Sequence, residues 1–207
     1  MPLSNKPNYM QKLLFSLAFL LTTYIGFSQN NPRPTRSRFW NAKESTFSLK
    51  AGDILVYHVK NNGEEYDYVV TIDKYDKGVD FSYRLTSKGI KGSVSIPETA
   101  LNDGATYLTD FAGGNKTTLW LSKTNFRELA AEKQTMMDMG TGIDTFTTKN
   151  TSTIKINFKG KEKILTIYHV ENESATDKKK FAVLTELNNP LIVTMDAGWT
   201  VTLKEVR

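Results

Sequence analysis

The sequence predicts a mainly β domain: a curved antiparallel sheet of about ten strands, half-barrel or sandwich-like, packed on one short α-helix. Apolar and polar residues alternate with a period of two through most of the chain after Phe47, which is the pattern of half-buried strands. Short runs rich in Gly, Asn and Asp separate these segments, and such short connections favour antiparallel pairing over crossover units. One run, 123–134, has helical spacing instead.

The first strands form a meander with a short turn at each connection. Asn61-Asn62-Gly63 is a strong hairpin signal. In the strand that follows it, the even positions from Tyr66 to Ile72 are apolar and most odd positions are polar. A second turn, 75–78, contains Gly78, which is available for a positive φ. We expect strands at 53–60, 66–75 and 79–85, extended by residues 90, 94 and 96.

The second half of the chain is looser from 97 to 116 and then returns to the strand pattern. Turn residues near 159–161, 188–190 and 197–198 divide the apolar runs of the C-terminal third. We expect strands at 154–158, 164–170, 181–187, 191–195 and 199–206.

The expected helix has Phe126, Leu129 and Ala130 at helical spacing, with Asn125 and Glu128 arranged as a capping box. Nearly every strand has one apolar face, so the sheet has a single interior to cover. Ten strands flatten into a sandwich, wrap around the helix or enclose a cavity, and the sequence leaves these three arrangements open.

The N-terminal 28 residues predict a signal peptide. Lys6 and Lys12 precede an apolar run of 15 residues, 13–27, which is shorter than the ~20 residues that span a bilayer. Small residues in Gly26-Phe27-Ser28 place the cleavage site before Gln29. The alternative is an uncleaved membrane anchor. We expect an exported chain, periplasmic or secreted, with no stable membrane span after cleavage, a flexible leader at 29–45 and one β domain at 46–207.

Composition excludes several functions. The chain of 207 residues has no cysteine, which excludes disulfides, zinc–thiolate sites, iron–sulfur clusters and a lipid anchor on an N-terminal cysteine. The formal charge of +5 falls to +3 without the signal peptide, because 25 basic residues then face 22 acidic ones. This charge is too small to predict a nucleic-acid partner.

No catalytic constellation is recognisable, so we expect neither an enzyme nor a cofactor. The chain lacks a Gly-x-Ser-x-Gly motif, and its two histidines, His58 and His169, end predicted strands as surface residues. The paired acids are interpreted as turn and surface residues; they are Glu64 with Glu65, Asp73 with Asp76, and Asp138 with Asp144.

A methionine cluster, Met136-Met137-Asp138-Met139, is the most unusual local feature. Thioethers bind soft Cu(I), and they also fill irregular cores, which is the favoured interpretation. Large apolar side chains predict either core packing or the lining of an apolar-ligand pocket. The candidate lining residues are Tyr83, Trp120, Phe126, Met137, Met195 and Trp199.

Three segments together resemble a known group of proteins: the run 47–57, Leu119-Trp120-Leu121-Ser122 before the helix, and the ending 189–195 with 203–206. They resemble uncharacterised exported bacterial all-β proteins with a domain similar to the half-barrel of periplasmic lipoprotein carriers. The resemblance implies an envelope location and a sheet wrapped on a helix, with no activity to carry over.

Two functions follow as hypotheses. The first is an exported cell-envelope domain with a non-enzymatic binding or structural role, whose partner is an unknown envelope protein. The alternative is a carrier or sensor of an apolar, lipid-like ligand on the inner face of the sheet. The oligomeric state stays open.

Overall fold

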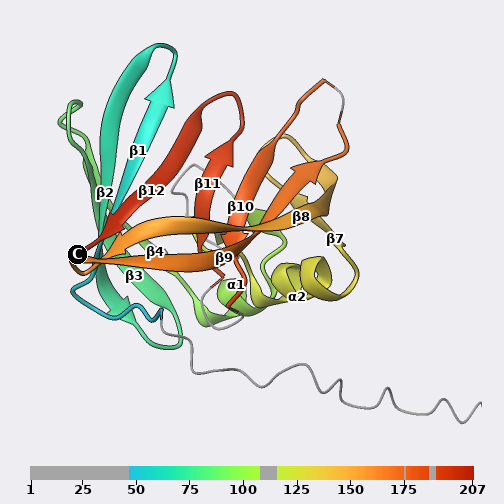
Figure 1. Ribbon diagram of the computed structural model, residues 1–207, viewed down its shortest axis with the longest axis horizontal. Coiled ribbons are helices and arrows are strands. Elements are labelled where there is room, and N and C mark those ends of the chain that lie inside the picture. Colours follow the sequence, from blue (N-terminus) through green and yellow to red (C-terminus); the bar gives the residue numbers. More distant parts are fainter. Residues whose placement is uncertain (1–46, 108–115, 175, 187–189) are drawn as a thin grey trace, which may run out of the picture. The chain divides into compact units, whose positions relative to one another are not determined.

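The computed structural model describes residues 47–107, 116–174, 176–186 and 190–207. The expected signal peptide, its cleavage site before Gln29 and the leader at 29–45 lie outside the described residues. The prediction of a mainly β fold is confirmed, because the described residues form one mixed sheet of twelve strands and two helices (Figure 1). No helix among them is long and apolar enough to cross a bilayer.

The elements follow one another along the chain as β1 (Ile54–Asn61), β2 (Glu64–Tyr75), β3 (Val79–Leu85), β4 (Lys91–Ile96), α1 (Glu98–Asp103), β5 (Thr106–Tyr107), β6 (Lys116–Thr117), α2 (Lys123–Ala131), β7 (Gln134–Asp138), β8 (Ile143–Phe158), β9 (Lys161–Asn172), β10 (Lys180–Leu184), β11 (Ile192–Asp196) and β12 (Thr200–Val206). In the sheet they are ordered β4-β3-β2-β1-β12-β11-β10-β9-β8-β7-β5-β6.

The first meander forms where the sequence predicts it. Asn62 and Gly63 have φ of 50° and 80°, as a two-residue hairpin turn requires, and Asn61 pairs directly with Glu64. Gly78 is needed for a different reason from the one expected. Its φ is not positive, but a Cβ there would lie 2.7 Å from the Ile96 carbonyl oxygen, so close approach of the backbone requires glycine.

The strand count and the pairing differ from the prediction. The described residues form twelve strands rather than about ten, and β5–β6, β5–β7 and β12–β8 pair in parallel. The region 97–116, expected to be loose, contains the short helix α1 and strand β5. The first half of β8 escaped prediction because the run 143–153 is rich in threonine and half-exposed, which removes the alternation of polarity. Strand β7 escaped prediction because the adjacent Met136 and Met137 are both apolar, so its short sequence does not alternate either.

The long β8–β9 hairpin closes part of the sheet into a ring. Its tip reaches the end of β12, where Asn157 and Phe158 pair with Glu205 and Val206. Because β8, β9, β10, β11 and β12 also pair in succession, these five strands form a closed circuit. In Figure 1 the hairpin crosses β10, β11 and β12.

The tip of this hairpin is held to the start of the domain by two contacts. The rings of Phe47 and Phe158 have centroids 4.9 Å apart. The Lys159 ammonium lies 2.8 Å from the Asp53 carboxylate, which is buried and also accepts a hydrogen bond from the Lys50 backbone N–H at 3.0 Å. These contacts therefore help to hold the ring closed where β8 meets β12, the two neighbouring strands of the ring that are farthest apart in the sequence.

Helix α2 begins one residue after a serine cap. The backbone N–H of Asn125 donates to the Ser122 hydroxyl, so Ser122 is the N-cap and the predicted capping box of Asn125 and Glu128 is wrong. The helix ends at Ala131 rather than at 134, because Lys133 has a φ of 61° and β7 begins at the next residue.

The interior is filled by the segment that leads into α2. The backbone N–H of Ile192 donates to Leu119, and that of Leu121 donates to Pro190, so the segment follows the start of β11. Trp120 packs against Phe81 at 5.9 Å between ring centroids. Leu119, Trp120 and Leu121 are buried in the hydrophobic core together with residues of the sheet, so this segment fills part of the interior.

Candidate functional site

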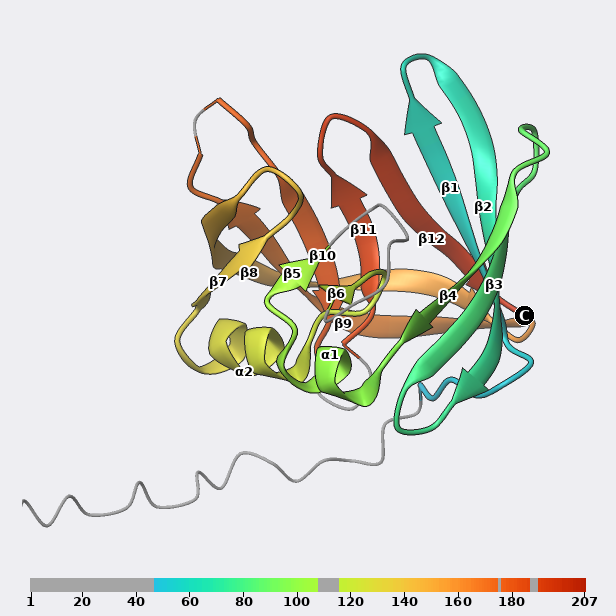
Figure 2. The ribbon, with the colours of Figure 1, turned by 180° about the vertical axis from the view of Figure 1, so that it is seen from behind.

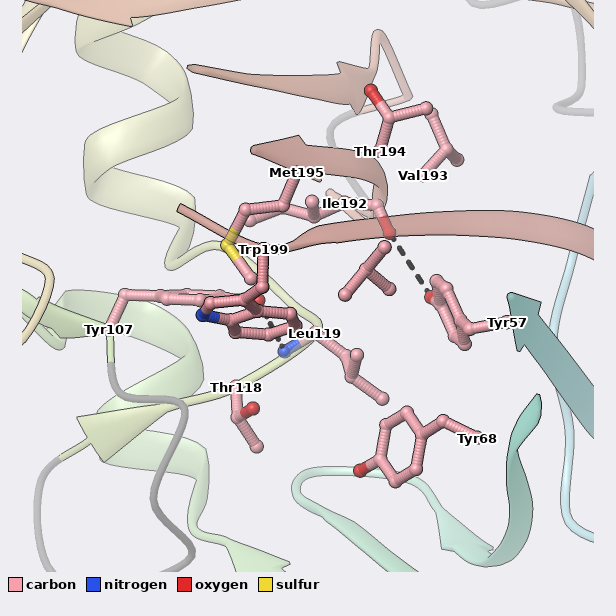
Figure 3. Close-up of a pocket in the computed structure, with 11 residues that line it drawn as sticks. Tyr57, Tyr68, Tyr107, Thr118, Leu119, Ile192, Val193, Thr194, Met195 and Trp199 are labelled. Carbon is pink, nitrogen blue, oxygen red and sulfur yellow. Dashed lines mark hydrogen bonds between the residues drawn. The ribbon is translucent and has the colours of Figure 1, made fainter. Parts of the chain in front are cut away.

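A small cavity remains inside the curved sheet, with a volume of about 50 Å³. It lies where β1, β2, β5, β11 and β12 meet the segment before α2 (Figure 3). Its wall is almost entirely apolar and aromatic. The lining residues are Tyr57, Tyr68, Tyr107, Thr118, Leu119, Ile192, Val193, Thr194, Met195, Trp199 and Val201.

Hydrogen bonds fix two of the three tyrosines. The Tyr57 hydroxyl donates to the Ile192 carbonyl at 3.1 Å, and the Tyr107 hydroxyl accepts from the Leu119 backbone N–H at 3.0 Å (Figure 3). Leu119 has a φ of 61°, an unusual value for a leucine, and the hydrogen bond that its N–H donates to Tyr107 helps to hold it there. The Tyr68 ring packs between neighbours, 6.2 Å from the Tyr57 ring centroid. These aromatic side chains therefore form a rigid wall.

Trp199 is the aromatic part of the wall that reaches solvent. It precedes β12 at the β11–β12 turn, where Gly198 has a φ of 84° and the Ala197 N–H donates to the Trp199 carbonyl. Unlike Tyr57 and Tyr107, which are buried, Trp199 is half-exposed. A half-exposed indole beside an apolar cavity is typical of a contact surface, because tryptophan combines a large apolar area with a polar N–H.

The structure brings two of the six candidate lining residues to this cavity, Met195 and Trp199. Trp120 is buried against Phe81 and lines a separate cavity of about 70 Å³. Phe126 and Met137 are 0% and 1% exposed and do not line this cavity. Tyr83 lies outside the cavity and packs edge-on against Tyr68. The six residues therefore do not form one pocket.

Sequence reasoning missed the three tyrosines of the cavity. Tyr57 and Tyr68 are direct cross-strand partners. The alternation of polarity and the hairpin register together place both side chains on the same face of the sheet. Tyr107 lies in the region taken as loose, so nothing in the local pattern marked it.

Burial keeps these tyrosines neutral. Desolvation raises the pKa of Tyr57 and Tyr68 above the usual value, and the neighbouring tyrosines add to the effect. Desolvation also raises the pKa of Tyr107 to about 12, although its hydrogen bond from Leu119 acts in the opposite direction. At neutral pH the cavity wall has no charge, so it is suited to an apolar group.

The same pKa values predict alkaline destabilisation. When a tyrosine has a higher pKa in the folded state than in the unfolded state, its contribution to the free energy of unfolding is complete below about pH 10, the unfolded pKa. That contribution is lost as the pH rises through the folded pKa. We expect Tyr107 alone to lower the free energy of unfolding by about 2 kcal/mol between pH 10 and pH 12. Urea denaturation across this range measures the slope. Tyr107→Phe should give a shallower slope, and an identical slope would contradict the assignment.

The methionine cluster does not converge on one point. Met136 and Met137 are adjacent on β7 and project to opposite faces, with exposures of 62% and 1%. Met139 is buried after the end of the strand. The described residues also contain no group of three or more His, Asp or Glu side chains placed to hold a metal ion. Packing therefore accounts for Met137 and Met139, whereas Met136 is exposed.

The histidines contact polar side chains on the sheet. His58 lies 3.1 Å from the Glu65 carboxylate, and the His169 ring lies 2.6 Å from the Ser152 hydroxyl. A Ser–His pair resembles part of a hydrolase triad, but such a triad needs a third group that orients the imidazole. No carboxylate of the described residues forms an ion pair with His169, and neither Ser152 nor His169 lines the tyrosine cavity.

The paired acids act as structural groups. Asp138 accepts hydrogen bonds from the backbone N–H groups of Gly140 and Gly142, at 2.7 and 3.0 Å, and so shapes the β7–β8 turn. Asp76 accepts from Gly78 N–H in the β2–β3 turn, and that bond lowers the pKa of its carboxyl group.

Comparison of the chain with protein-family models, with curated proteins and with solved structures found no match.

Proposed function

We propose that this chain is an exported, non-enzymatic binding domain of the cell envelope, and that its cavity receives an apolar side chain of a partner protein. The observation that carries the proposal is the cavity of about 50 Å³ between buried tyrosines and the half-exposed Trp199. Tryptophan and tyrosine around a small pocket are the residues that dominate binding energy at protein interfaces.

The size of the cavity favours a side chain over a lipid. Pockets for small-molecule ligands have volumes of about 300–1,000 Å³, and a cavity of about 150 Å³ holds benzene. A cavity of about 50 Å³ accepts a branched aliphatic end such as that of Val or Leu. Burial of one such group contributes about 1.5–3 kcal/mol, so other contacts around Trp199 supply the remaining affinity. A lipid carrier would require the packed interior to open.

Export is supported by the N-terminal pattern of two lysines, an apolar run and small residues before Gln29. N-terminal sequencing of the chain purified from its own host tests this part. We expect the sequence to begin at Gln29, and an intact Met1 would contradict export by cleavage.

The cysteine-free chain allows a sharp test of the binding site, because one introduced cysteine labels a single position. We expect Thr194→Cys, half-exposed on β11 beside the cavity, to give one discrete cross-linked product with a photoreactive thiol reagent in the envelope of the host. Thr153→Cys, on the exposed face of β8, is the matched control and should give none. Adding Trp199→Ala should abolish the product.

Two results would contradict this proposal. One is the same product pattern from both cysteine positions. The other is a lipid that co-purifies with the chain in native mass spectrometry and is lost on Trp199→Ala, which would establish the carrier function instead.

A further inference from the structure

A second hollow lies on the face of β2, β3 and β4 that points away from the core, with a volume of about 570 Å³. Core residues such as Ile72 and Phe81 pair on one face of these strands. The residues between them project to the other face and line the hollow. They are Val69, Thr71, Ser82, Arg84, Lys91 and Ser93. Tyr83 and Gly92, which pair with each other in the core-facing row, complete the lining.

The strand register sets two cations side by side in this hollow. Arg84 on β3 pairs directly with Lys91 on β4, and both are exposed. Like charges at directly opposed positions destabilise a sheet, so the arrangement has a cost in the unbound protein. A neighbouring row pairs the hydroxyl residues Thr71, Ser82 and Ser93 across the same three strands.

The neighbouring acids do not neutralise this pair. Among the described residues neither Arg84 nor Lys91 forms an ion pair. The acids on this face of β2 and β3 have other partners. Asp67, the nearest to Arg84 in the register, lies 3.3 Å from the His58 ring. Asp73 accepts a hydrogen bond from Ser82 at 3.3 Å, and Asp80 accepts one from Ser95 at 2.5 Å. Strand β4 is also the edge of the sheet, beside β3 in Figure 2, so a ligand reaches the hollow from the surface.

We propose that this hollow binds a phosphate or sulfate group, held by Arg84 and Lys91 with hydroxyl donors from Thr71 and Ser93. A guanidinium fork binds an oxyanion through two parallel hydrogen bonds, and an ammonium adds a point charge. The bound anion removes the repulsion between the two cations. This site is separate from the tyrosine cavity and does not depend on the function proposed for it.

Calorimetric titration of the full chain with inorganic phosphate at low ionic strength tests the site. We expect saturable binding, weakened about tenfold by Arg84→Gln and by Lys91→Gln, since each removes one charge-assisted contact. Lys149→Gln is the matched control, because Lys149 is exposed on β8, does not line this hollow and has the same charge. It should change the affinity less than twofold.

Thermal unfolding separates a binding role from a structural one. Without phosphate, Arg84→Gln and Lys91→Gln should melt at or above the temperature of the unaltered chain, because repulsion is relieved. Added phosphate should raise the melting temperature of the unaltered chain and of Lys149→Gln, and leave the two site variants unchanged.

Vesicles identify the source of the oxyanion. If phosphatidylglycerol vesicles bind with the same variant dependence and phosphatidylcholine vesicles do not, the group belongs to a lipid headgroup; binding of phosphate alone indicates a soluble ligand. Either result supports the site. The proposal is overturned if neither phosphate nor phosphatidylglycerol vesicles bind saturably. It is also overturned if Lys149→Gln lowers the affinity as much as Arg84→Gln and Lys91→Gln do.

Discussion

Replacing Trp120 by alanine is expected to lower the free energy of unfolding by about 3–5 kcal/mol, the range for a large aromatic residue removed from a core. Trp120 is 1% exposed and joins the segment before α2 to the inner face of β2 and β3 through Tyr75 and Phe81, at 6.2 and 5.9 Å between ring centroids. The indole is held on two sides, so the void left behind cannot easily collapse. Urea denaturation followed by far-ultraviolet circular dichroism measures the loss.

Trp199→Ala provides the matched control for this substitution. Trp199 is half-exposed at a turn, so the same change should cost about 1–2 kcal/mol. The two variants also separate stability from binding, since only Trp199→Ala should abolish the cross-link at Thr194. Equal losses of stability in the two variants would show that Trp120 does not hold the inner segment in place.

Replacing Asn125 by alanine is expected to cost about 2–4 kcal/mol, because it removes several buried hydrogen bonds together. The Ser122 hydroxyl donates to the Asn125 side-chain oxygen at 2.6 Å. The Asn125 amide donates to Thr135 at 2.7 Å and to the Met136 carbonyl at 3.3 Å. The side chain thus joins the start of α2 to β7, and its loss leaves buried polar atoms unsatisfied. Thermal and urea unfolding measure the change.

Thr124→Ala is the control, because the Thr124 hydroxyl bonds to Asp103 at the surface and its removal should cost no more than about 0.5 kcal/mol. A second variant, Asn125→Asp, keeps the shape and removes the amide donors. Its buried carboxylate should be more destabilising at pH 7 than at pH 4, where protonation restores one donor. A loss that does not change with pH would contradict the network.

The parts of the fold that were predictable depend on neighbouring residues. The hairpin at Asn62-Gly63 formed as expected because these residues tolerate positive φ and the flanking strands alternate in polarity. The start of α2 was predicted close to its position, but its cap was misassigned, since Ser122 and Asn125 are both good capping residues. Strand β7 and the first half of β8 have no such local signal.

The site was harder to predict than the fold. Trp199 and Met195 were candidates because they are large and apolar, yet the same criterion selected Trp120, Phe126 and Met137, which the structure places elsewhere. Hydrophobicity predicts burial, but not whether a buried side chain borders another side chain or an empty volume. Tyr57 meets Ile192 across 135 residues of chain, a contact that no local pattern contains.

The sequence by itself determined that this chain forms a sheet with one apolar face, where most strands lie and where several turns reverse the chain, because period-two polarity and turn chemistry act between near neighbours. Only the tertiary structure decided that β8 returns to β12, joining Asn157 to Glu205 across 48 residues, and that the segment before α2 fills the interior. Strand ends far apart in sequence meet through the bend of the whole sheet, and that bend decides whether the interior is packed or hollow. It is also the register of β3 and β4 in the folded sheet that brings Arg84 beside Lys91.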